Sequence, residues 1–152
     1  MARDDDLHDL TRHPVLAALE PEALRFLLRE ASQRILRSGE ILFRRDEPSD
    51  GGYFLRSGSV VLEATEPGRD EKIVRPPTLI GEMALIAPTR RPATAVAREP
   101  SGVLQIPRSL FQRALAESPR SAERLRRLLE KRLHGFAQEL NALRESAFED
   151  HD

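Results

Sequence analysis

The stretch from Ser32 to Ile106 is a series of short apolar segments separated by turn residues, and this pattern constrains the fold more than any other feature. The segments are rich in Ile, Val, Leu and Phe, and Gly or Pro stands in most of the gaps. A short apolar run between turn signals is typical of a β-strand. The pattern predicts strands at 33–36, 41–44, 53–56, 59–64, 71–74, 93–98 and 103–106. Strands at such spacing indicate an antiparallel sandwich or barrel.

Helical patterns flank this region on both sides. Apolar residues between Val15 and Leu28 recur at helical spacing, and Pro21 suits the first turn of a helix over roughly 21–31. Beyond Pro107 the pattern predicts a short helix and then a long one, which begins at Ser118-Pro119 and runs to about residue 146. The predicted fold is therefore mainly β with flanking helices: a jelly-roll-like antiparallel β-roll with N-terminal helices and a long C-terminal helix.

The chain divides on this basis into a disordered N-terminus at 1–13, a β-roll domain at 14–133 and a C-terminal helix extension and tail at 134–152. Its hydrophobic content of 39% is enough for one core. No apolar run approaches the ~20 residues that span a bilayer, and the charged N-terminus is not a secretory signal. The sequence has no Cys, which agrees with a reducing compartment. A cytoplasmic location is expected.

The remaining composition argues against several function classes. The net charge of −1 gives no general attraction to nucleic acid or to an anionic membrane, so neither is expected as a partner. The four His show no metal-ligand spacing, and no Ser-His-Asp or paired-carboxylate arrangement can be argued. We therefore expect no metal, no cofactor and no enzymatic activity.

Residues 81–97 interrupt the strands and carry the groups of a candidate anion site. Gly81 allows a tight turn, and 82–86 can form one helical turn whose free N–H groups attract an anion. Arg91 stands just before a strand, where its guanidinium can bind a phosphate through two hydrogen bonds. Glu82 would repel that phosphate unless it accepts a hydrogen bond from a sugar hydroxyl. The combination suits a sugar phosphate of low net charge.

This segment resembles the phosphate-binding cassette of the cyclic-nucleotide-binding family, which includes catabolite-activator-type regulators, kinase regulatory subunits and gated channels. The family pattern G-E-[LM]-A-L, a short loop and R-x-A-[TS] is matched by Gly81, Glu82, Met83, Ala84, Leu85, Arg91, Ala93 and Thr94. Residues 44–60 are similar to the second signature of the family, and the resemblance runs from about Leu10 to Leu133. It implies a stand-alone regulatory module that binds a cyclic nucleotide.

The resemblance also implies roles for single residues. Glu82 would bind the ribose 2′-hydroxyl, Arg91 would pair with the cyclic phosphate, and the amides of Met83 and Ala84 would help to cradle it. The ligand-binding set expected from the resemblance is Gly81, Glu82, Met83, Ala84, Arg91, Pro92, Ala93, Thr94, Leu133 and Phe136.

Three positions depart from the family pattern. Pro92 stands where the family usually has Ala, Ser or Thr, and proline has no N–H to offer the phosphate. Selection of cyclic GMP in the family commonly uses a hydroxyl at this position, so we expect cyclic AMP to be preferred, with modest affinity. Asp46 replaces a common Gly but tolerates the left-handed conformation. Pro76-Pro77 replaces a turn that contains Gly.

The long helix carries an apolar stripe with alternating spacings of four and three, which is typical of a coiled-coil seam. Its members are Leu129, Leu133, Phe136, Leu140, Leu143 and Ala147. Up to about Leu129 we expect the stripe to pack on the roll. Beyond it, the helix is expected either to form a homodimer or to cap the pocket as a lid, with Leu133 or Phe136 against the ligand.

Two function classes remain open from the sequence. In the first, a ligand-responsive module signals through its C-terminal helix to an effector protein, since the chain leaves no room after that helix for a helix-turn-helix domain. In the second, the pocket does not bind nucleotide and the β-roll is a constitutive interaction or dimerisation module.

Overall fold

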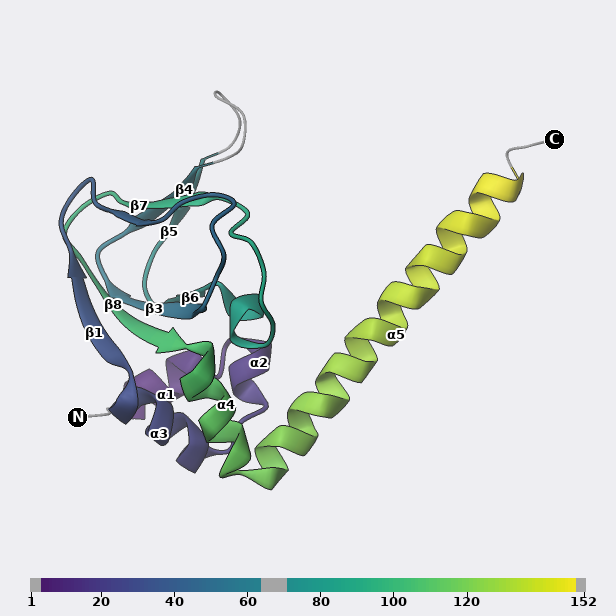
Figure 1. Ribbon diagram of the computed structural model, residues 1–152, viewed down its shortest axis with the longest axis horizontal. Helices are drawn as coiled ribbons and strands as arrows, with labels where there is room; N and C mark the ends of the chain where they lie inside the picture. The colour runs from purple at the N-terminus through teal and green to yellow at the C-terminus, as the bar shows by residue number, and fades with distance from the viewer. Residues whose placement is uncertain (1–3, 64–70, 150–152) are drawn as a thin grey trace.

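The computed structural model describes residues 4–63 and 71–149, which form two four-stranded antiparallel sheets and flanking helices (Figure 1). The first sheet has the order β1-β8-β3-β6 and the second the order β2-β7-β4-β5. In chain order the strands are β1 (Ser32–Leu36), β2 (Ile41–Phe43), β3 (Gly51–Ser57), β4 (Val60–Glu63), β5 (Lys72–Val74), β6 (Thr78–Ile80), β7 (Thr94–Ala97) and β8 (Ser101–Pro107). The β-roll predicted from the sequence is confirmed.

Helices precede and follow the roll. They are α1 (Asp4–Leu10), α2 (Pro14–Ala17), α3 (Pro21–Glu30), α4 (Arg108–Ala116) and α5 (Pro119–Glu149). One turn of 3-10 helix, η1 (Glu82–Leu85), interrupts the strands between β6 and β7. Within the described part of the chain, no helix is long and apolar enough to cross a membrane.

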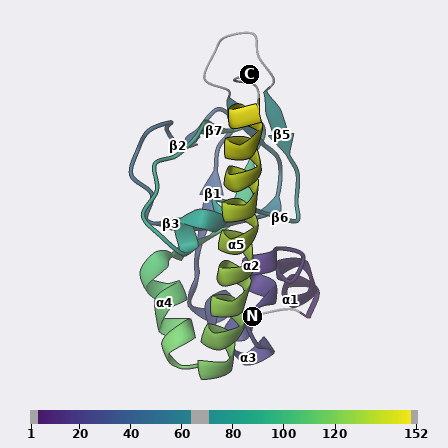
Figure 2. The same ribbon diagram turned by 90° about the vertical axis from the view of Figure 1, so that its right-hand side faces the viewer.

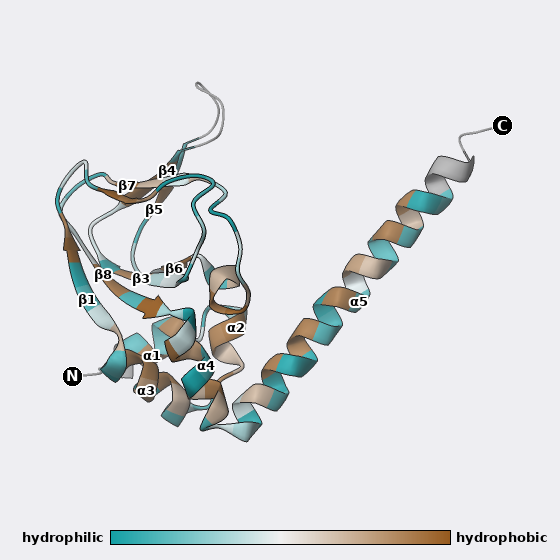
Figure 3. Ribbon diagram, viewed as in Figure 1, coloured by the Kyte–Doolittle hydropathy of each residue, from teal (hydrophilic) through white to brown (hydrophobic). Residues whose placement is uncertain are grey.

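Two apolar cores follow from the alternation of side chains along the first sheet. Phe54 of β3 stands opposite Leu104 of β8, and both belong to the core between this sheet and the helices. The next pair, Leu55 and Val103, points to the other face and belongs to the core between the two sheets. Figure 3 shows the apolar colouring of β8, which contributes to both cores.

The N-terminal segment differs from the disorder expected for residues 1–13. Residues 4–10 form helix α1, and the side chain of Leu10 is fully buried among the residues of the helical core. Asp6 adds an ion pair with Arg56 of β3, with 3.0 Å between Oδ2 and Nη2. The segment is mostly polar, so its composition gave no indication that Leu10 would be buried. Burial of this side chain stabilises the ordered helix.

Helix α5 leaves the roll after its first turns and leans away from it (Figures 1 and 2). Leu125 is buried and Leu129 packs on the helical core. Beyond them the apolar stripe is exposed: Leu133 and Leu143 are each 68% exposed and Phe136 is 58% exposed. The expectation that the helix packs on the roll only up to about Leu129 is confirmed.

Some expected features lie outside the described residues. They are positions 1–3 and 150–152 of the two tails, residue 64 of the strand predicted at 59–64, and the side chain of Ala147. Strand β6 was not predicted. It has only three residues and follows the cis Pro76-Pro77 bond.

Candidate functional site

The residue that caps the start of the 3-10 helix η1 is Gly81, which has a left-handed backbone with φ of +83°. Ala84 and Leu85 are buried and hold the turn against the roll, whereas Met83 is half-exposed. The N–H of Ala84 donates to the carbonyl of Gly81 at 3.1 Å. This bond engages an amide that was expected to help cradle a phosphate.

Arg91 is buried between the sheets, with only 4% of its surface exposed. Its backbone is held by the 46–47 loop, since its N–H donates to the carbonyl of Glu47 and its own carbonyl accepts from Asp46. Asp46 has φ of +67°, as expected for a residue in a position that often holds Gly. The side chain therefore points inward from a fixed backbone.

The guanidinium of Arg91 lies in an aromatic niche next to the turn of η1. Its central carbon is 4.3 Å from the ring centre of Phe43 and 5.6 Å from that of Tyr53. Nη2 donates to the carbonyl of Gly51 at 2.8 Å. A Cβ built on Gly81 would lie 2.7 Å from Nη1, so the two residues are in direct contact.

The charge of Arg91 has little compensation nearby. The closest carboxylate among the described residues is that of Asp50, which is exposed and 4.0 Å from Nη2. Burial lowers the pKa of Arg91, and burial also raises the pKa of the adjacent Tyr53 phenol. A buried cation with spare N–H donors and no bonded carboxylate is suited to a compact anion such as a phosphate.

Glu82 is the first residue of the turn, and its side chain lies between His13, just before α2, and Arg132 of α5. Its Oε1 is 3.5 Å from Nη2 of Arg132 on α5, and its Oε2 is 4.0 Å from Nδ1 of His13. The side chain is 21% exposed. A carboxylate in this position can still accept a hydrogen bond from a sugar hydroxyl, because an ionised carboxylate has about four lone-pair sites.

Two further side chains, those of Arg108 and Thr94, fix the surroundings of the site. Arg108, at the start of α4, donates through Nε to the carbonyl of Ala84 at 2.9 Å and through Nη2 to the carbonyl of Ser49 at 2.7 Å. The hydroxyl of Thr94 accepts a hydrogen bond from the N–H of Arg45 at 3.0 Å. Thr94 thus holds the loop before the site.

The arrangement of η1 and Arg91 lies within a known domain family. The profile of the cyclic nucleotide-binding domain matches residues 33–118, which include η1 and Arg91. The chain belongs to the cyclic nucleotide-binding domain family.

Relatives with known names share this domain. The chain is 30% identical over 133 residues to the "Cyclic AMP receptor protein" of Thermus thermophilus, covering 86% of this chain and 62% of that protein. It is 32% identical over 120 residues to the "Cyclic nucleotide-gated potassium channel mll3241" of Mesorhizobium japonicum, covering 78% of this chain and 33% of that one. The chain thus spans less than two thirds of the length of either relative.

Solved structures agree with the family. The N-terminal domain of a transcriptional regulator from Streptomyces coelicolor superposes with a TM-score of 0.74 at 32% identity, covering 87% of this chain and 94% of that one. A cyclic nucleotide-binding-like protein from Brucella abortus gives 0.68 at 37% identity, covering 74% and 99%.

The structure brings part of the expected ligand set together. The turn and its cap contain Gly81, Glu82, Met83 and Ala84, and the guanidinium of Arg91 lies next to them. Pro92 is exposed. Ala93 and Thr94 are half-buried where β7 begins. It does not bring Leu133 and Phe136 to the site: both are exposed on α5 where that helix leans away. Arg132, immediately before Leu133, does reach the cassette from α5.

The sequence did not indicate several neighbours of the domain's cassette. His13, Phe43 and Arg108 reach it only through the fold, and no local pattern marks them. Asp50 lies in the 44–60 signature, but its approach to Arg91 was not predicted. Arg132 likewise reaches the cassette through the fold, where it contacts Glu82.

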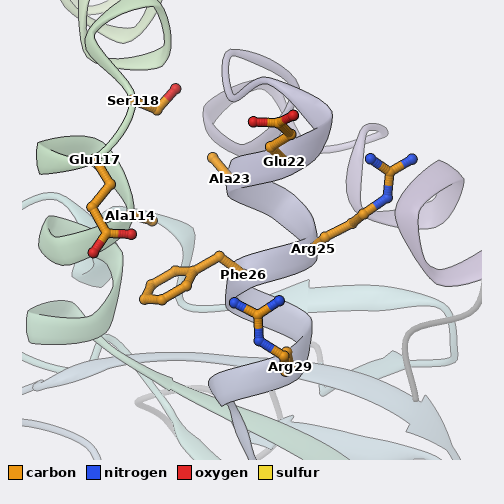
Figure 4. Close-up of a pocket in the computed structure, with 8 residues that line it drawn as sticks. All are labelled: Glu22, Ala23, Arg25, Phe26, Arg29, Ala114, Glu117 and Ser118. Carbon is orange, nitrogen blue, oxygen red and sulfur yellow. The ribbon is translucent and has the colours of Figure 1, made fainter.

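A separate groove of about 360 Å³ lies between α3 and α4 (Figure 4). Phe26 projects across it, with the guanidinium groups of Arg29 and Arg113 at 5.8 and 5.4 Å from its ring centre. The groove shares no lining residue with the cassette. Across the described residues, no group of three or more His, Asp and Glu is placed to hold a metal ion.

Proposed function

We propose that this chain is a non-enzymatic regulatory module that binds cyclic AMP in the β-roll and signals through α5 to a partner protein in the cytoplasm. The burial of Arg91, without a closely bonded carboxylate among the described residues, is the observation that carries the proposal. A buried cation is costly unless an anion compensates it, and the cyclic phosphate supplies that anion. No catalytic step, nucleic acid or membrane is part of this function.

A cyclic phosphate at Arg91 determines the roles of the other residues of the site. The phosphate binds Arg91 and the free N–H groups at the start of η1, of which Met83 offers one. Glu82 accepts a hydrogen bond from the ribose 2′-hydroxyl. Gly81, Ala84, Pro92, Ala93 and Thr94 shape the wall of the pocket around these contacts.

Pro92 sets the ligand preference and the strength of binding. It has neither the N–H that would bond the phosphate nor a hydroxyl that would bond a guanine, so cyclic AMP is preferred over cyclic GMP. One missing charge-assisted hydrogen bond lowers the affinity by about tenfold or more.

A ligand bound at Glu82 can change the position of α5 through the contact between Glu82 and Arg132. A ribose hydroxyl at Glu82 competes with Arg132, whose Nη2 lies 3.5 Å from the carboxylate. A ligand shifts a helix only if it interacts differently with two positions of that helix. Release or tightening of the Arg132 contact provides this difference, and Leu133 and Phe136 follow Arg132 in the moving segment.

Calorimetric titration with cyclic AMP and cyclic GMP tests the proposal. Arg91→Ala removes a charge from a partly desolvated phosphate, and we expect it to weaken cyclic AMP binding by about 30-fold or more. Glu82→Ala removes a hydrogen bond and costs about tenfold. Arg98→Ala is the control, because Arg98 is an exposed arginine just after β7, at the opposite end of that strand from Thr94. Tighter binding of cyclic GMP, or the reverse order of the two variants, contradicts these roles.

A second function has its own support. The engaged amide of Ala84 and the missing N–H of Pro92 both remove expected phosphate donors. A β-roll whose pocket does not bind nucleotide would act as a constitutive interaction or dimerisation module. Absence of any heat from either nucleotide, with the fold intact, would favour this function.

The signalling role of α5 is tested by hydrogen exchange and by sedimentation at several concentrations, with and without cyclic AMP. We expect nucleotide to change the protection of residues 129–147, which either self-associate or cap the pocket. Leu140→Ser should reduce this response, whereas Asn141→Ser, next to it but off the stripe, should not. Equal protection in both states, together with a monomer throughout, would exclude α5 as lid or dimer seam.

A further inference from the structure

His13 links the helices that precede the roll to the strand that leads into the cassette. It lies between α1 and α2, and its Nε2 is 3.1 Å from the backbone nitrogen of Leu79 in β6. A backbone N–H can only donate, so Nε2 accepts and carries no hydrogen. The ring is therefore the neutral tautomer with its hydrogen on Nδ1.

This hydrogen bond occupies the open edge of a sheet. Strand β6 is the last strand in the order β1-β8-β3-β6, so one side of it has no strand partner. An unpaired edge leaves backbone groups without hydrogen bonds unless another part of the chain supplies them. His13 supplies one at Leu79, and the chain continues from β6 directly into Gly81 and Glu82.

The other ring nitrogen faces the candidate ribose-binding carboxylate. Nδ1 is 4.0 Å from Oε2 of Glu82, and the two side chains are 19% and 21% exposed. The charged group on the opposite side is Arg132, whose Nη2 is 3.5 Å from Oε1. At 4.0 Å this approach is longer than a hydrogen bond, so a neutral His13 adds no second positive charge beside Glu82, and the carboxylate keeps its acceptor sites for a ligand hydroxyl.

We propose that His13 is a positioning residue of the nucleotide site, which fixes Glu82 for the ribose 2′-hydroxyl by holding β6, the strand that leads directly into Gly81 and Glu82. The proposal rests on the proposed function, because it assigns His13 to the ribose contact of that site. His13 acts through Glu82 and does not itself touch the ligand.

Binding of cyclic AMP and of 2′-deoxy cyclic AMP separates this role from a merely structural one. The wild-type protein should prefer cyclic AMP by about tenfold, the value of one hydrogen bond to a charged group. His13→Ala should lose most of this preference, because Glu82 is no longer held. His13→Gln retains an acceptor for the N–H of Leu79 and should restore part of it. His8→Ala, in the exposed part of the same segment, should leave it unchanged.

Nitrogen NMR of the imidazole in the ligand-free protein reports the tautomer directly. A hydrogen on Nε2, or full preference for cyclic AMP in a folded His13→Ala variant, would overturn the proposal while the proposed function stands. If the wild-type protein binds neither nucleotide, the proposed function and the role of His13 in it both fall.

Discussion

Replacing Gly81 by alanine tests the contact between the cassette turn and Arg91. Gly81 has φ of +83°, a conformation that costs an L-residue about 1–2 kcal/mol. The added Cβ would also lie 2.7 Å from Nη1 of Arg91, well inside normal contact distance. Because that atom is the far end of a flexible side chain, we expect the guanidinium to move rather than the backbone. Gly81→Ala should therefore lose both stability and anion affinity.

Gly39 offers a matched control for the backbone cost alone. Its φ is +84°, and a Cβ at this position meets nothing within 4 Å. Gly39→Ala should thus introduce the same backbone strain without a contact with Arg91. For a chain of this size, about 1–2 kcal/mol corresponds to a fall of roughly 2–8 °C in Tm for each variant.

Thermal unfolding and titration with cyclic AMP, run on the wild type and both variants, separate the two effects. The two alanine variants should unfold at similar temperatures. Only Gly81→Ala should bind more weakly, by about tenfold, the value of one bond to a charged group. If Gly81→Ala binds as tightly as the wild type, the contact with Arg91 does not belong to the ligand site. A neutral Gly39→Ala would show that the strain has been overestimated.

Tyr53 and Arg108 give two further predictions. Burial raises the pKa of Tyr53 above its ordinary value of 10.0, so its stabilisation is complete below about pH 10 and is lost as the pH rises through the higher native pKa. Because the chain has one Tyr and no Trp, phenolate absorbance measured with and without urea shows this directly, and coincident curves would refute it. Arg108→Lys keeps the charge but not the forked geometry that reaches Ala84 and Ser49. It should lower the free energy of unfolding by about 1.5–3 kcal/mol in urea titrations, and an unchanged midpoint would contradict this.

Local pattern was sufficient for most of the fold. Strands such as β3 and β8 are long, bounded by turn residues and buried on at least one face, and each of these properties is visible along the chain. Strand β6 was missed because its three residues follow Pro76-Pro77, which on its own indicates a turn. Helix α1 was missed because a single buried side chain, Leu10, outweighs the polar character of its neighbours.

The residues of the candidate site, like the elements of the fold, were predictable from the sequence only in part. Glu82 and Arg91 are close in sequence, so a motif could identify them. Their partners come from distant segments: His13 precedes Glu82 by 69 positions and Arg132 follows it by 50. Only the closure of the roll and the direction of α5 bring these residues to the cassette, and neither property has a local signature.

The two arginines next to η1 differ in a way that supports our proposal that Arg91 binds the ligand. Arg108 donates to Ala84 and to Ser49, so its guanidinium serves the protein's own carbonyls. Arg91 is buried more deeply, yet it donates to one carbonyl, that of Gly51, and rests on two aromatic rings. A guanidinium has five N–H donors, and the carbonyl of Gly51 is the one hydrogen-bond acceptor that Arg91 meets among the described residues. No fully buried side-chain nitrogen in that part of the chain lacks a partner, so the remaining donors of Arg91 belong to atoms that keep some solvent contact. Such donors on a largely buried cation are available to a ligand anion, whereas those of Arg108 already serve the protein.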